Sequence, residues 1–138
     1  MSEIVRLAEH YSASVANKVG EGAKVLGALH AAGINLTALW GYPHRAGKAT
    51  FEFIPENGAA FVAAAKGAKL KLSKKQTAFY VQGDDRPGAI ADLMAKLAAA
   101  KINVGSLQAV CAGGGRYGAV IFLPQAAVGK AAKALGAA

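Results

Sequence analysis

The chain has 138 residues, about the length of one domain. Hydrophobic residues make up 54% of the sequence and charged residues only 17%, a composition that excludes a largely disordered chain. The formal net charge of +8 suits a nucleic-acid or anionic partner, and equally a solvated surface that carries many lysines. No apolar run reaches the roughly 18 residues of a membrane-spanning helix, so we expect no membrane partner.

The opening residues do not pair a charged segment with an apolar one, as a secretory signal does, so we expect a cytoplasmic location. The single cysteine, Cys111, cannot form an internal disulfide. No histidine has a cysteine or carboxylate at metal-ligand spacing, and no titratable pair has the spacing of a catalytic site. We therefore expect no metal, no cofactor and no enzyme activity, although a small enzyme is one of three functional classes to be tested.

The first half of the chain predicts the order strand, helix, strand, strand, helix, strand. Polar and apolar side chains alternate in the strands, and apolar side chains recur every three or four residues in the first helix. Gly33 is placed to end that helix, because glycine readily takes the left-handed conformation. The predicted strands are 11–16, 34–40, 48–55 and 69–73, the predicted helices are 21–32 and 59–69, and 41–47 is a predicted loop. Residues 1–8 are ambiguous.

The second half repeats this order as far as its second helix. The predicted strands are 77–83, 102–111 and 116–124, and the predicted helices are 89–100 and 125–136. A loop over 84–88 follows the first of these strands, and the glycine run at 113–115 forms a hairpin turn. That run lacks the spacing of a phosphate-binding loop and no helix follows it.

A shift of about 68 residues superimposes the two halves, as a duplication would. It matches Gly20 with Gly88 and the pair Ile34-Asn35 with Ile102-Asn103. The repeat predicts an α+β protein of two ferredoxin-like βαββαβ units, over 1–73 and 74–138, with antiparallel sheets and helices on one face. The second copy has no last strand, so either the N-terminal segment or another subunit fills that edge. Because an unpaired edge invites pairing, we expect a homodimer.

The duplicated pattern resembles a tandem pair of ACT domains, regulatory modules of amino-acid metabolism. The resemblance is strongest over Asp85-Arg86-Pro87-Gly88, the helix after it, and Lys101-Ile102-Asn103-Val104. In the first half, Asn17-Lys18-Val19-Gly20 has valine where the family usually has proline. The resemblance implies a non-catalytic regulatory protein that binds a small amino acid or related metabolite at an interface between such units.

The resemblance also implies which residues contact the ligand, and they have a physical rationale. A glycine lets a ligand approach the backbone, a helix N-terminus suits a carboxylate, and asparagine can both donate and accept hydrogen bonds. Plainer roles are also open: the glycines could be turn residues, the asparagines could cap the strand ends or tie down the preceding turn, and the aspartate could be a helix N-cap. The candidate ligand-binding residues are Asn17, Gly20, Asn35, Asp85, Gly88 and Asn103.

The main alternative is a nucleic-acid-binding protein of the same fold class, because RNA-recognition folds share the βαββαβ order and stack bases on aromatic residues of the sheet. The sequence has no RNP-like string of basic residues, glycine and aromatics. The lysines over 66–75 alternate with leucines, a pattern that favours a solvated edge strand. We therefore do not expect a nucleic-acid partner.

Overall fold

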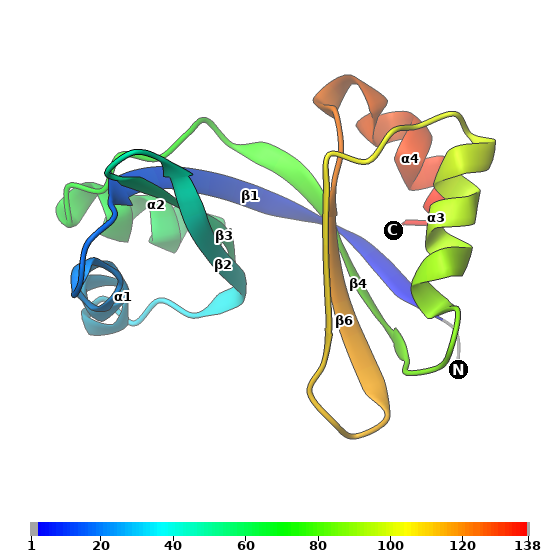
Figure 1. The fold of residues 1–138 in the computed structure, drawn as a ribbon, viewed down its shortest axis with the longest axis horizontal. Coiled ribbons are helices and arrows are strands. Elements are labelled where there is room, and N and C mark those ends of the chain that lie inside the picture. The colour runs from blue at the N-terminus through cyan, green and yellow to red at the C-terminus, as the bar shows by residue number, and fades with distance from the viewer. Residues whose placement is uncertain (1–2, 138) are drawn as a thin grey trace. The chain divides into compact units, whose positions relative to one another are not determined.

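The computed structural model describes residues 3–137. Its contacts divide the chain into two compact units: the N unit, Glu9–Gln76, and the C unit, which joins the chain up to Ala8 with the chain from Thr77 onward. The elements, shown in Figure 1, are β1 (Ile4–Ala16), α1 (Glu21–Ala31), β2 (Leu36–Arg45), β3 (Lys48–Pro55), α2 (Gly58–Gly67), β4 (Gln76–Asp84), α3 (Ala89–Ala99), β5 (Ser106–Cys111), β6 (Arg116–Phe122), the short 3-10 helix η1 (Gln125–Ala127) and α4 (Val128–Leu135).

The N unit is a helix-covered antiparallel sheet with the strand order β2-β3-β1. Strand β3 lies between its two neighbours, and Phe53 pairs with Tyr11 of β1 and Leu39 of β2. The face of the sheet that carries Tyr11 and Phe53 packs on Leu29 of α1 and Phe61 of α2. The ring of Phe61 lies 5.5 Å from that of Tyr11 and 5.0 Å from that of Phe53, so aromatic packing dominates this core.

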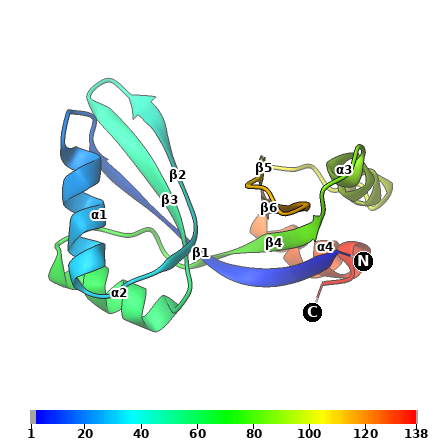
Figure 2. The ribbon, with the colours of Figure 1, turned by 90° about the horizontal axis from the view of Figure 1, so that it is seen from below.

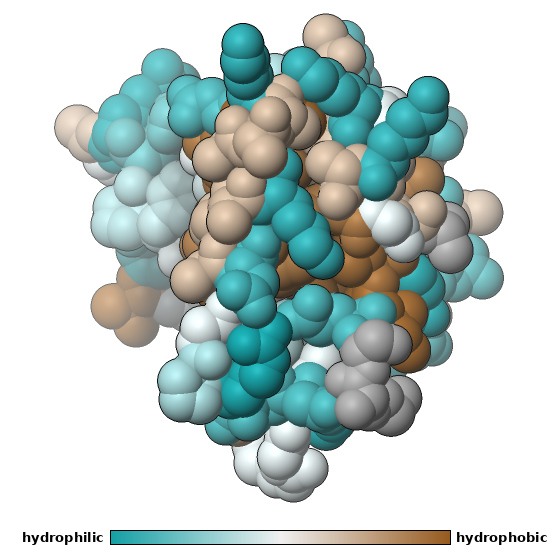
Figure 3. Space-filling model, turned by 90° about the vertical axis from the view of Figure 1, so that its right-hand side faces the viewer, coloured by the Kyte–Doolittle hydropathy of each residue, from teal (hydrophilic) through white to brown (hydrophobic). Residues whose placement is uncertain are grey.

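The C unit has the strand order β1-β4-β6-β5, with α3 and α4 packed on its sheet (Figure 2). Strands β4 and β5 both pair antiparallel with β6, so that Val81 and Ala109 flank Ala119. Seen from the side of α3 and α4, hydrophobic surface lies between hydrophilic side chains (Figure 3). The buried core consists of Val5, Phe79, Val81, Ala89, Leu93, Leu97, Ile102, Tyr117, Ala119, Ile121, Leu123, Ala131 and Leu135.

The N-terminal segment occupies the position of the missing last strand of the C unit. Strand β1 adjoins β4, Arg6 Nη2 donates to Gln82 Oε1 at 3.0 Å, and the Tyr117 hydroxyl donates to Glu3 at 2.8 Å. The predicted α+β class and the ferredoxin-like arrangement are confirmed. The open edge of the second half is filled by the N-terminal segment of the same chain and not by another subunit. The segment up to Ala8 therefore belongs to the C unit.

Three local predictions are wrong. The strand expected over 69–73 is reduced to one isolated bridge between Ala13 and Leu72, because the Ser73 side chain replaces a backbone partner and accepts from the Ser12 amide at 3.0 Å. The loop expected over 41–47 continues β2 to Arg45, where Pro43 is tolerated because this is an edge strand. The strand expected from residue 102 begins only at Ser106. No helix within residues 3–137 is long and apolar enough to cross a membrane.

Candidate functional site

The two glycine loops have the same backbone geometry. Gly20 and Gly88 are the N-cap residues of α1 and α3, with left-handed φ angles of 89° and 84°. Their carbonyls accept the first helical hydrogen bonds, from the amides of Lys24 at 3.0 Å and Asp92 at 2.9 Å. A residue with a Cβ is strained at such φ values, so both positions favour glycine. The predicted turn role of these glycines is therefore confirmed.

The residue three before each glycine is anchored in the same way. The Asn17 amide donates to the Gly47 carbonyl at 3.0 Å, and the Asp85 amide donates to the Gly115 carbonyl at 2.9 Å. The two donors are 68 residues apart in the sequence, and so are the two acceptors, which is the offset of the repeat. The loops are thus equivalent, and differences in their chemistry come from the side chains around them.

Helix α3 begins without a side-chain cap. The amides of Ile90 and Ala91, in its first turn, have no partner within the helix and carry its positive dipole end. The interpretation of Asp85 as the N-cap is wrong, because Gly88 holds that position and the Asp85 carboxylate instead accepts from the Cys111 thiol at 3.2 Å. Asp85 is exposed, so its charge faces solvent beside these amides.

These groups share one hollow of about 330 Å³ at the start of α3. One side is the loop and first turn of α3, and the other is the end of β5 with Tyr117 of β6. The Arg86 guanidinium is already paired, with Nη2 2.6 Å from Asp92 Oδ2. The lining residues are Asp85, Arg86, Gly88, Ala89, Ile90, Ala91, Ala109, Val110, Cys111 and Tyr117.

The Tyr117 phenol forms a neutral wall of this hollow. Its hydroxyl donates to Glu3 Oε2 at 2.8 Å. Burial, together with that hydrogen bond, raises the pKa of Tyr117 to about 12. The phenol is therefore protonated at physiological pH, and the charges that line the hollow are those of Asp85 and Arg86.

In the N unit, the equivalent space is occupied by the ring of Phe51. A Cβ on Gly22 of α1 would lie 3.5 Å from Phe51 Cζ, and one on Gly41 of β2 would lie 3.0 Å from Phe51 Cδ1. At the 68-residue offset, Phe51 corresponds to Ala119, which leaves room between α3 and β5. Sequence reasoning missed Phe51, although the repeat alignment already pairs this large residue with an alanine.

The remaining two candidates lie at the opposite ends of the helices. Asn35 follows α1, whose 11 residues separate it from Gly20 by about 16 Å along the helix. Asn35 Nδ2 donates to Glu56 Oε2 at 3.0 Å, and the Glu56 amide donates to the Asn35 carbonyl at 3.0 Å. Asn35 thus ties two chain connections together, as the plainer interpretation predicted. Asn103 follows α3 in the same way and is exposed.

Each unit therefore has a helix-covered antiparallel sheet with a left-handed glycine before its first helix, and the pattern occurs twice. The chain has the tandem ACT-type fold. Solved structures share it: a Bacteroides thetaiotaomicron protein superimposes with a TM-score of 0.83 at 20% identity, covering 96% of this chain and 88% of the other.

Two further structures with this ACT-type fold are regulatory subunits of aspartate kinase. The subunit from Thermus thermophilus has a TM-score of 0.66 at 15% identity, and that from Thermus flavus 0.62 at 16%; each match covers 99% of this chain and 95% of the other. No protein-family model matches the sequence, and no curated protein matches it significantly. Within the described part of the chain, no cluster of three or more histidine, cysteine or acidic residues could hold a metal ion.

Proposed function

We propose that this chain is a non-catalytic regulatory protein that binds a small amino acid or related metabolite in the hollow at the start of α3. The observation that carries the proposal is that one hollow contains both a group that binds anions and a group that binds cations. The uncapped amides of Ile90 and Ala91 suit a carboxylate, and the Asp85 carboxylate suits an ammonium group. A free α-amino acid carries both groups within a few ångströms of each other.

The two loops differ in this proposal. Asp85 and Gly88 belong to the open hollow, and they form the primary site. Asn17 and Gly20 have the same backbone geometry, but Phe51 fills the adjoining space, so we assign them the weaker site. Asn35 and Asn103 would contact a ligand only where a unit of a second copy presents them to it.

The unpaired edge of β5 supports a homodimer. Val110 is 69% exposed and Leu107 is 37% exposed, and the strand has neither a charge nor a proline to discourage pairing. The other edge strand, β2, has Pro43, Arg45 and two register shifts, which are the usual protections. A second copy paired antiparallel along β5 would adjoin Ala109, Val110 and Cys111, which also line the hollow. Ligand binding and assembly would then be coupled, and each would strengthen the other.

The test is a thermal-shift screen of the twenty amino acids, followed by titration of the best one. A ligand at 100 times its Kd stabilises the folded state by about 2.7 kcal/mol. We expect Asp85→Ala to abolish the shift and Asn17→Ala, the matched change in the other loop, to keep it. Absence of a shift with every amino acid at millimolar concentration, or equal loss in both variants, would refute the proposed site. Sedimentation with and without the ligand tests the coupled dimer.

A further inference from the structure

The N unit has a second hollow, on the sheet face opposite its helices, that the proposed function does not use. Alternation along β1 and β3 places Ser12, Ser14, Thr50 and Glu52 on this face, while Tyr11 and Phe53 point to the core. The hollow has a volume of about 520 Å³, within the usual range of small-molecule sites. It is lined by Ser12, Ala13, Ser14, Tyr42, His44, Arg45, Thr50, Glu52, Lys71, Leu72 and Ser73.

The strand register arranges these side chains in rows across the sheet. Thr50 pairs with Tyr42 on one side and Ser14 on the other, and the bridge between Ala13 and Leu72 brings Lys71 and Ser73 alongside β1. Hydroxyl groups therefore cover the floor from one edge of the unit to the other. A floor of this kind offers hydrogen-bond donors and acceptors to a ligand that itself carries several oxygens.

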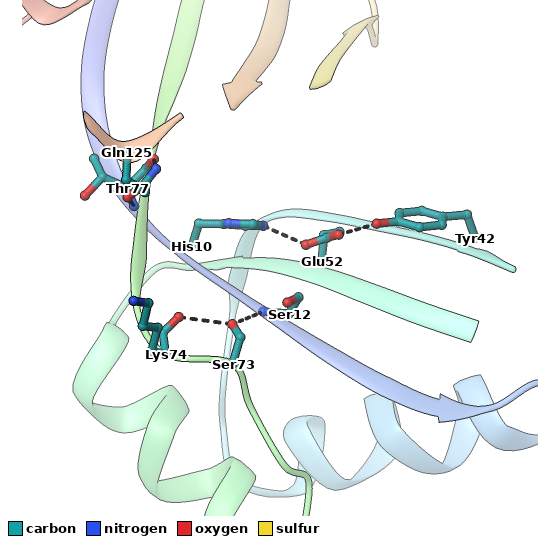
Figure 4. A network of polar contacts seen from close by, with 8 residues as sticks. All are labelled: His10, Ser12, Tyr42, Glu52, Ser73, Lys74, Thr77 and Gln125. Atoms are coloured by element: carbon teal, nitrogen blue, oxygen red, sulfur yellow. Dashed lines mark hydrogen bonds and ion pairs between the residues drawn. The ribbon is translucent and has the colours of Figure 1, made fainter. Parts of the chain in front are cut away.

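One carboxylate, Glu52, lies in this floor, and it is held in place by two hydrogen bonds (Figure 4). His10 Nε2 is 2.8 Å from Glu52 Oε1, and the Tyr42 hydroxyl donates to Oε2. Burial raises the pKa of Glu52, but the hydrogen bonds to His10 and Tyr42 outweigh it and hold the pKa below its ordinary value. His10 is buried and stacks on Trp40 at 5.8 Å with the rings 5° from parallel. The floor is thus preorganised.

The sides of the hollow are basic. Arg45 and His44 come from the end of β2, and Lys71 comes from the segment beside β1; all three are exposed. With Arg45 and Lys71 charged and Glu52 ionised, the lining carries a net positive charge even when His44 is neutral. A guanidinium and an ammonium at the sides, above a floor of hydroxyls, suit a phosphate group attached to a hydroxylated carbon skeleton.

We propose that this hollow is a second ligand site, which takes a small phosphorylated polyol. Arg45 and Lys71 hold the phosphate, and Ser12, Ser14, Thr50 and Glu52 bind the hydroxyl groups. Single-stranded nucleic acid fits the same charges less well, because Glu52 repels a phosphate backbone and the Trp40 ring is already stacked on His10 rather than standing free for a base. The site is independent of the hollow at Asp85, and its ligand would act on the regulator separately from an amino acid.

The test is a backbone-amide NMR titration of the full chain with ribose 5-phosphate, inorganic phosphate and ribose. We expect ribose 5-phosphate to bind most tightly, with the largest shifts at Ser12, Thr50 and Lys71. Loss of one charge-assisted contact in Arg45→Gln or Lys71→Gln should weaken binding about tenfold. The matched control Lys66→Gln, which removes the same charge from the last turn of α2, should leave the affinity within about twofold.

Four outcomes would overturn this second site. These are no response to either phosphate compound at about 10 mM, equal weakening by Lys66→Gln, equal affinity for phosphate and ribose 5-phosphate, and tighter binding of a single-stranded oligonucleotide on the same face. Asp85→Ala should not change binding of ribose 5-phosphate. That variant separates this proposal from the amino-acid site, since either one can fail while the other stands.

Discussion

Docking of the N-terminal segment on the C unit can be tested by Val5→Ala. Val5 is 5% exposed and belongs to a core that includes Phe79, Val81 and Leu135. The change deletes two methyl groups, worth about 1.6 kcal/mol of transfer free energy, and the cavity left behind brings the loss to about 2 kcal/mol. For a unit of this size, 1 kcal/mol corresponds to about 4–8 °C, so the melting temperature of the C unit should fall by roughly 10 °C.

The matched control is Leu7→Ala on the same strand. Leu7 is 46% exposed, so its truncation should cost less than about 0.5 kcal/mol despite the larger side chain removed. Hydrogen exchange resolved by peptide should locate the effect: a loss of about 2 kcal/mol speeds exchange of β4 and β6 amides by more than about tenfold, while those of β3 are much less affected. Equal destabilisation by the two variants, or no change in β4, would show that Val5 is not part of this core.

Two further predictions concern backbone conformation and pH. Gly88→Ala should destabilise the protein by about 1–2 kcal/mol because φ is 84° at this position, whereas Gly27→Ala, at a helical position with open space around it, should stabilise α1 by about 0.5–1 kcal/mol. Thermal melts of both variants measure these changes. A Gly88→Ala variant as stable as wild type would contradict the strain argument. Because the pKa of Glu52 is lowered in the folded state, its stabilisation is present above its unfolded pKa of about 4.3 and is lost as the pH falls through the lower folded value. Urea unfolding should therefore show Glu52→Gln less stable than wild type at pH 7, with the gap closing in acid, and a pH-independent gap would argue against stabilisation by hydrogen bonds to the ionised carboxylate.

The glycines made much of this fold predictable. Gly33 directly follows the C-cap of α1 with φ 74°, in the helix-ending role that the sequence predicted, and Lys101 takes the matching place after the C-cap of α3 with φ 60°. Glycine at positions 20 and 88 likewise marked both loops, because few other residues tolerate that conformation. Residue type and spacing thus located both loops, although they assigned the N-cap of α3 to Asp85 and not to Gly88.

Other features depend on contacts between distant segments. Residues 4–8 show no clean alternation because only Val5 among them is buried, so this segment carries no strand pattern that could be detected in the sequence. The segment over 69–73 has the pattern of a strand, but Lys69 adopts a φ of 59° and only Leu72 bridges β1. The repeat alignment pairs Phe51 with Ala119, but only the structure shows that the Phe51 ring lies against Gly22 and Gly41 and so fills the space beside the first loop.

Strand β1 also sets the order in which the chain can fold as it is synthesised. The second half of the strand belongs to a unit that is complete once Gln76 has left the ribosome. Glu3, directly before β1, accepts a hydrogen bond from the Tyr117 hydroxyl, and Val5 of β1 shares a core with Leu135, so this part of the C unit is completed only by residues that are synthesised much later. Such long sequence separation slows folding and leaves an apolar strand exposed during synthesis. A nascent chain that stalls before α4 would therefore present a folded N unit with an unsatisfied strand at its start.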